Sequence, residues 1–112
     1  MQKEIWKTIE ECPNYSVSNL GRVCNNKSNR ILSQKDCKTG YKMVGLMKEG
    51  KRYYRYVHRL VAIAFLDNPE GYKIVNHKDK HRDNNCVDNL EWCSPAYNTH
   101  HGLSKYTQLS LF

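Results

Sequence analysis

The stretch that decides the fold is "VNHKDKHRDNNCVDNLEW", residues 75–92, which contains two histidines and four asparagines within 18 residues. Apolar side chains alternate with polar ones just before it, at Tyr72 and Ile74, and again at its end, at Leu90 and Trp92. Alternation with a period of two is typical of half-buried β-strands. The pattern therefore predicts a strand over residues 72–77, a polar loop, and a second strand over residues 88–92.

Helical signals lie on both sides of this strand–loop–strand unit. Before it, apolar residues follow the i, i+3, i+4, i+7, i+8 spacing of an amphipathic helix, at Val57, Leu60, Val61, Ala64 and Phe65. Pro69 is expected to end that helix, because the residue before a proline avoids the helical region. After the unit, Ser94 is a good N-cap, Pro95 suits the first helical position and Gly102 is a natural stop. We therefore expect a short helix over residues 94–102 and a tail, residues 103–112, without a clear pattern.

The first half of the chain has the pattern of short strands and turns. The segment "NYSVSNLGRVCN" alternates around Tyr15, Val17 and Val23, and "RIL" at residues 30–32 is a further short strand. Two longer runs, residues 41–47 and 52–57, flank "KEGK", where Gly50 is free to adopt a positive φ, so a hairpin is predicted. The predicted fold class is α+β, with a strand-rich N-terminal part followed by a helix and the strand–loop–strand–helix unit.

Composition excludes several classes of protein. A chain of 112 residues is one domain's worth, and its longest apolar run, "LVAIAFL", is far too short to cross a membrane. The N-terminal "MQKEIWKTIEE" lacks the apolar segment of a signal peptide. The five cysteines are odd in number and form no CxxC pair, so a disulfide framework is not expected. We expect a soluble, cytoplasmic protein.

Basic charge is concentrated in one region. The chain has a net charge of +7, yet residues 20–60 hold eleven Lys or Arg against two acids, a net +9, and the rest is close to balanced. A basic region interleaved with tyrosine and asparagine is typical of a surface that binds a polyanion, although solubility alone would also account for it.

Four polar side chains of the second half form a candidate reaction centre. If the last helix packs across the two strands, Asn76, His77, Asn89 and Asn98 converge. A neutral imidazole can take a proton from water near neutral pH. Two amide oxygens can hold a hard divalent cation whose other positions are filled by water and phosphate. These residue types therefore suit a phosphodiester hydrolase with one base and one metal ion.

The sequence "VHRLVAIAF…NP…VNHKDKHRDNNCVDNLEW…N" resembles the HNH endonucleases of phages and mobile introns, which have the ββα-metal (His-Me finger) fold. The agreement runs from His58 to about His101 and includes the 13-residue step from Asn76 to Asn89 and the nine-residue step to Asn98. The N-terminal "EIWKTIEECPNYSVSNLGRV" resembles the strand-rich DNA-binding module that precedes HNH domains in many intron-encoded nicking enzymes. The resemblance implies a DNA-binding motif over residues 1–56, a nuclease unit over 57–102 and a tail over 103–112.

The resemblance also implies roles for individual residues. His77 would be the general base, and Asn89 would help to orient it and tie the polar loop together. Asn76 and Asn98 would be the ligands of one Mg²⁺ or Mn²⁺ ion. Many relatives carry Asp at the place of Asn76, so both protein ligands here are neutral. We therefore expect productive metal binding only when DNA phosphate completes the coordination.

Double-stranded DNA is the implied partner, and the polar loop would be braced by Asn84 and Asn85. The expected DNA contacts, mostly to phosphates, are Arg22, Lys27, Arg30, Lys35, Lys38, Lys42, Arg52 and Arg55. Target sequence, nicking versus double-strand cleavage, and monomer versus homodimer stay open. The protein would be encoded by a phage or mobile element.

Two alternatives stay open beside the nuclease. One is a non-catalytic DNA-binding protein that keeps the HNH fold. The other is a zinc-stabilised module built from His77, His81, Cys86 and Cys93, but the loose cysteine spacing makes zinc unlikely. Of the other histidines, His81 is expected to be solvated or to face phosphate, and His58 is expected to make a structural hydrogen bond rather than to contact the substrate.

Overall fold

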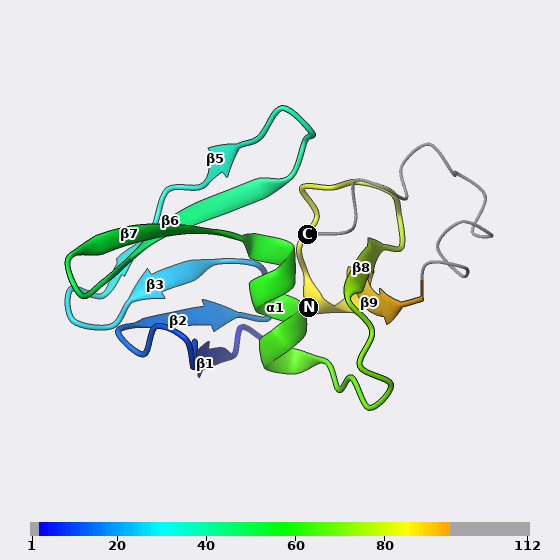
Figure 1. The fold of residues 1–112 in the computed structure, drawn as a ribbon, viewed down its shortest axis with the longest axis horizontal. Coiled ribbons are helices and arrows are strands. Elements are labelled where there is room, and N and C mark those ends of the chain that lie inside the picture. Colours follow the sequence, from blue (N-terminus) through cyan, green and yellow to red (C-terminus); the bar gives the residue numbers. More distant parts are fainter. Residues whose placement is uncertain (1–2, 95–112) are drawn as a thin grey trace.

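The computed structural model describes residues 3–94 (Figure 1). A four-stranded antiparallel sheet comes first, with its strands in chain order: β1 (Trp6–Thr8), β2 (Tyr15–Ser18), β3 (Val23–Asn25) and β4 (Arg30–Ile31). A three-stranded antiparallel sheet follows, made of β5 (Lys35–Asp36), β6 (Lys42–Lys48) and β7 (Lys51–Tyr56). Then come helix α1 (Val57–Phe65), strand β8 (Ile74–His77), the 3₁₀ turn η1 (Val87–Asn89) and strand β9 (Leu90–Cys93). The α+β class and the strand-rich N-terminal part are as predicted.

The hairpin β6–β7 closes at the predicted turn. Lys48 pairs with Lys51, and the two residues between them, Glu49 and Gly50, have φ values of +53° and +78°. Two successive residues with positive φ are what a tight hairpin turn of the mirror-image type requires, because its twist matches that of the strands.

Helix α1 presents the predicted apolar face to the core. Val57, Leu60 and Val61 are buried, and the helix ends at Phe65, ahead of Pro69. In Figure 1 the helix stands between the two N-terminal sheets and the hairpin β8–β9. Leu66, just after the helix, accepts a hydrogen bond of 3.3 Å from Trp92 Nε1, which ties the helix end to β9.

Several predicted boundaries are corrected by the structure. The strand expected over residues 72–77 begins only at Ile74, and residues 87–89 form η1, so the strand expected from residue 88 begins at Leu90. Strands β1 and β5, of three and two residues, were not predicted. The helix expected over residues 94–102 and the tail fall outside the described residues, apart from Ser94.

One hydrophobic core joins the early and the late parts of the described chain. Its buried members come from both N-terminal sheets, from α1 and from the hairpin β8–β9; among them are Val17, Val23, Leu46, Val61, Val75 and Leu90. The N-terminal sheets therefore pack directly on the elements that carry the polar loop. Within residues 3–94, no helix has the length and apolar character needed to cross a membrane.

Candidate active site

The hairpin β8–β9 delivers two polar side chains to the end of a buried strand. Asn76 pairs with Glu91 and His77 pairs with Leu90 across the hairpin. Asn76 is only 7% exposed and His77 only 5%. Burying polar groups costs free energy unless they are hydrogen-bonded. Both of these side chains have a hydrogen-bond partner within the hairpin or its loop.

The hydrogen bond to Asn85 selects one tautomer of His77, and burial favours its neutral form. Its Nε2 lies 2.8 Å from Asn85 Oδ1, an atom that only accepts, so Nε2 carries the proton and Nδ1 keeps its lone pair. Burial lowers the pKa of His77 below its usual value, while the hydrogen bond to Asn85 and the charge of Asp79 oppose that shift. The ring is therefore neutral at pH 7, and its Nδ1 can accept a proton.

Asn76 is oriented by a cross-strand carboxylate. Its Nδ2 donates a 2.9 Å hydrogen bond to Glu91 Oε2. Since the amide nitrogen is committed in this way, Oδ1 is the atom that Asn76 can offer to a hard cation. Glu91 also places a negative charge directly beside the neutral amide. Sequence reasoning missed Glu91, because the register that places it opposite Asn76 depends on the second strand beginning at Leu90 rather than at residue 88.

The polar loop is ordered around one aspartate. Asp79 accepts hydrogen bonds from Asn84 Nδ2 (2.8 Å), Asn89 Nδ2 (2.8 Å) and the backbone N–H of His81 (2.8 Å). Asn89 Oδ1 in turn accepts from the backbone N–H of Asp79 at 3.0 Å. Desolvation raises the pKa of Asp79, but these hydrogen bonds outweigh it and hold that pKa at about 2. The carboxylate is thus ionised throughout the neutral range; the sequence reading did not single it out.

The predicted loop residues divide into two groups in the structure. Asn84 and Asn89 gather on Asp79, and Asn89 Nδ2 also donates to the Asn84 carbonyl at 2.9 Å. Asn85, expected only to brace the loop, makes the direct contact with His77. Asn98, the second expected metal ligand, lies outside the described residues.

A second buried imidazole lies behind His77. His58 is 1% exposed, its ring is stacked on Tyr41 at 4.8 Å, and its centroid is 5.1 Å from that of His77. The expected structural hydrogen bond is wrong: neither ring nitrogen of His58 has a partner among the described residues. Burial lowers the pKa of His58 to about 3, with smaller contributions from the charges of His77 and Arg59, so this ring stays neutral.

The expected DNA-contacting cations fall into two sets. Three of them are in ion pairs within the protein: Arg22 with Glu4, Lys42 with Asp36, and Arg55 with Glu11. The other five have exposed side chains: Lys27, Arg30, Lys35, Lys38 and Arg52. Lys35 Nζ lies 5.3 Å from the ring centre of the exposed Tyr54, which gives this surface an aromatic face beside a cation.

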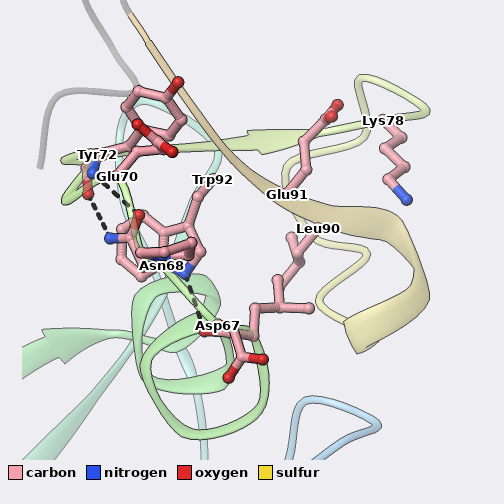
Figure 2. A pocket seen from close by; sticks show the side chains of 10 residues that line it. Asp67, Asn68, Glu70, Tyr72, Lys78, Leu90, Glu91 and Trp92 are labelled. Carbon is pink, nitrogen blue, oxygen red and sulfur yellow. Dashed lines mark hydrogen bonds between the residues drawn. The ribbon is translucent and has the colours of Figure 1, made fainter.

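A shallow pocket beside the hairpin has the opposite charge (Figure 2). Asp67, Glu70 and Glu91 line it together with a single cation, Lys78. Asn68 shapes its wall, since its side chain bonds both the N–H (2.9 Å) and the carbonyl (2.7 Å) of Tyr72. Its acidic lining contrasts with the exposed cations of the N-terminal sheets.

The described residues contain no cluster of three or more His, Cys, Asp or Glu side chains that could hold a metal ion. His77, His81, Cys86 and Cys93, the four residues of the zinc alternative, all lie within residues 3–94. His81 is exposed, as expected, and Cys93 is buried, which raises the pKa of its thiol to about 11.

The sequence matches two families along its length. Residues 4–47 match the NUMOD4 motif and residues 55–100 match the HNH endonuclease family. The DNA endonuclease I-HmuI of Bacillus phage SP01 is 41% identical over 103 residues, which are 91% of this chain and 59% of that protein. The uncharacterized HNH endonuclease L245 of Acanthamoeba polyphaga mimivirus is 35% identical over 101 residues, 90% of this chain and 31% of that protein.

A solved structure, described as DNA binding and cleavage by the HNH homing endonuclease I-HmuI, has the same fold. It superposes with a TM-score of 0.81 at 41% identity and covers 92% of this chain and 60% of that chain. This chain therefore spans less than two thirds of the length of these relatives. The hairpin β8–β9 and its polar loop lie inside the region of the HNH match.

Proposed function

Because this chain belongs to the HNH endonuclease family and carries a NUMOD4 motif, we propose that it hydrolyses phosphodiester bonds in DNA with His77 as the general base. The observation that carries the proposal is the state of His77: buried, neutral at pH 7, and bonded to Asn85 through Nε2. That bond leaves Nδ1 free to remove a proton from an attacking water.

Asn85 has a part in this proton transfer. When Nδ1 of His77 takes the proton, the ring becomes positively charged, and the Nε2–H bond to Asn85 Oδ1 becomes a charge-assisted one. Burial disfavours that cation, whereas Asn85 and Asp79 favour it. The balance keeps the base unprotonated at neutral pH while supporting it during the reaction.

The donor set fits a hard divalent cation. Asn76 offers a fixed amide oxygen, and the Glu91 carboxylate lies on the same side of the hairpin. We propose Asn76 and Asn98 as ligands of Mg²⁺ or Mn²⁺, with Glu91 orienting Asn76. HNH endonucleases are metal-dependent as a class. When bound, such an ion neutralises charge on the scissile phosphate and on the leaving oxygen.

Double-stranded DNA is the proposed substrate, held by residues 1–56 and cut by the unit of residues 57–102. We assign the phosphate contacts to the five exposed cations Lys27, Arg30, Lys35, Lys38 and Arg52. Arg22, Lys42 and Arg55 contribute only after they leave their carboxylate partners, so each is expected to add less.

A plasmid-nicking assay with Mg²⁺ or Mn²⁺ tests the proposal. We expect His77→Ala to lower the rate by about 10²- to 10⁴-fold, the usual contribution of a general base. His81→Ala is the matched control, because His81 is an exposed imidazole of the same loop, and its rate should equal that of the wild type. Activity that survives His77→Ala overturns the mechanism. DNA binding without nicking by the wild type supports the non-catalytic alternative instead.

A further inference from the structure

The turn between β2 and β3, residues 18–22, lies against the polar loop. Three consecutive residues of the turn face three consecutive residues of the loop. Asn19 accepts a 2.8 Å hydrogen bond on its carbonyl from the N–H of Val87. The Leu20 carbonyl is 3.9 Å from Cys86 Sγ.

Gly21 makes the third contact, with Asn85. A Cβ placed on Gly21 would lie 3.0 Å from both the Cβ and the carbonyl oxygen of Asn85, closer than real Cβ atoms normally come. Gly21 also has a φ of +86°, a conformation that favours glycine. Two independent features thus favour glycine at this position: the positive φ of the backbone and the lack of space beside Asn85.

The turn is rigid. Ser18 Oγ accepts hydrogen bonds from the N–H groups of Leu20 (3.2 Å) and Arg22 (3.1 Å). The side chain of Asn19 accepts from the N–H of Ile5 at 2.7 Å and donates to the Lys3 carbonyl at 3.0 Å. The turn therefore limits the positions available to the loop residues that contact it, Asn85, Cys86 and Val87.

Asn85 connects the turn to the reaction centre, because it contacts both Gly21 and His77. It is 4% exposed, with its backbone against Gly21 and its Oδ1 on His77 Nε2 at 2.8 Å. The amide sets both the tautomer and the direction of the imidazole ring. A displacement of Asn85 by a few tenths of an ångström therefore moves Nδ1 of His77 relative to the attacking water.

We propose that the turn of residues 18–22 is a positioning element for His77, in which Gly21 supports Asn85 and Asn85 supports the ring. The inference rests on the proposed role of His77 as base. It assigns residues of the NUMOD4 segment to the orientation of the nuclease centre, in addition to any contact with DNA.

Gly21→Ala tests the inference, with Gly71→Ala as its control. Gly71 has a similar φ of +69°, but a Cβ there meets nothing within 4 Å, so both variants share the backbone strain and only one displaces Asn85. We expect Tm to fall in both variants, and further in Gly21→Ala because of the added contact with Asn85. In plasmid nicking, Gly21→Ala should lower kcat by about 10- to 100-fold with KM for DNA unchanged, whereas Gly71→Ala stays at the wild-type rate.

A second pair of variants keeps the test open if Gly21→Ala does not fold. Ser18→Ala removes the oxygen that fixes the turn without adding an atom. Ser16→Ala is its control, since Ser16 lies on the same strand and bonds Asn26 instead of the turn. We expect kcat to fall only for Ser18→Ala. The NMR signal of the His77 Nε2 proton should shift or exchange faster in Ser18→Ala and stay unchanged in Ser16→Ala.

The outcomes separate this inference from the proposed function. A wild-type protein without nicking activity overturns the function itself. If the wild type nicks and His77→Ala does not, but Gly21→Ala matches Gly71→Ala or Ser18→Ala matches Ser16→Ala in both kcat and the His77 signal, the positioning role alone is overturned.

Discussion

The hairpins β6–β7 and β8–β9 each join two antiparallel strands, but their connections are ordered in different ways. The first closes with two residues, Glu49 and Gly50, and its shape is set by backbone pairing and turn geometry. The second leaves a long polar connection between His77 and Leu90, which is ordered by side-chain hydrogen bonds onto Asp79. Local geometry therefore builds the first hairpin, while the second depends on side chains that meet from separate positions. Single substitutions should affect the two hairpins unequally.

The largest effect on stability is expected at acidic pH and arises from His58, whose buried ring lies next to that of His77. The pKa of His58 is about 3 in the folded protein and about 6.5 when unfolded. The unfolded chain therefore binds the proton first, and stability is lost as pH falls from 6.5 towards 3. Urea unfolding should show that the wild type loses about 3 kcal/mol more than His58→Phe between pH 7 and pH 4. Equal losses in the two proteins would mean that His58 is not the group responsible.

The next effect concerns the centre of the polar loop. Asp79→Ala removes the acceptor of three hydrogen bonds, and the nicking rate should fall by about 100-fold, as for other groups that orient a reactive residue. Asp88→Ala is the matched control, because it removes an exposed carboxylate from the same loop. Amide exchange in residues 78–89 should speed up only in Asp79→Ala. A rate equal to that of the control would show that the loop keeps its shape without Asp79.

A smaller effect is expected at the cross-strand pair of the second hairpin. Glu91→Gln keeps an acceptor for Asn76 Nδ2 but removes the charge. In the DNA complex, Mn²⁺ binding followed by electron paramagnetic resonance should weaken about tenfold. Glu70→Gln, which removes an exposed carboxylate from the same pocket, should leave the affinity unchanged (Figure 2). Equal affinities in the two variants would remove Glu91 from the metal site.

The smallest effect belongs to the first hairpin. Glu49 has a φ of +53°, which is unfavourable for any residue with a Cβ, and it is exposed. Glu49→Gly relieves that strain but makes the unfolded chain more flexible, so the net gain in stability should be about 0.5 kcal/mol. Thermal unfolding measures the gain, and nicking activity should not change. A loss of stability would show that the turn depends on more than backbone geometry.

The sequence predicted those parts of the fold that local pattern controls. Helix α1 and the hairpin β6–β7 appear where periodicity and turn residues placed them, and His77 lies at the end of a short strand as expected. The partners of His77 and Asn76 were harder to foresee. Glu91 follows from strand register, and Asn85 and Asp79 follow from loop geometry, neither of which has a periodic signal.

Long-range contacts and internal charge pairing were also beyond the sequence. Leu20 and Cys86 meet although they are 66 positions apart, and no composition or spacing marks such a pair. Charge counting identified a basic region but could not tell that Arg22 and Arg55 are neutralised by Glu4 and Glu11. A sequence gives the number of cations, whereas their availability depends on which acids the fold brings beside them.

Strand β7 ends at Tyr56 and helix α1 begins at Val57, so no linker separates the sheet from the helix. The sheets, helix α1 and the hairpin β8–β9 also share one hydrophobic core. We therefore expect the N-terminal sheets, proposed to bind DNA, and the hairpin β8–β9, proposed to carry the reaction centre, to move together. We expect the nucleic acid, rather than this junction, to adjust when a phosphate is brought to His77. Sites that bend or open at low energetic cost should be cut faster than stiff ones of equal affinity.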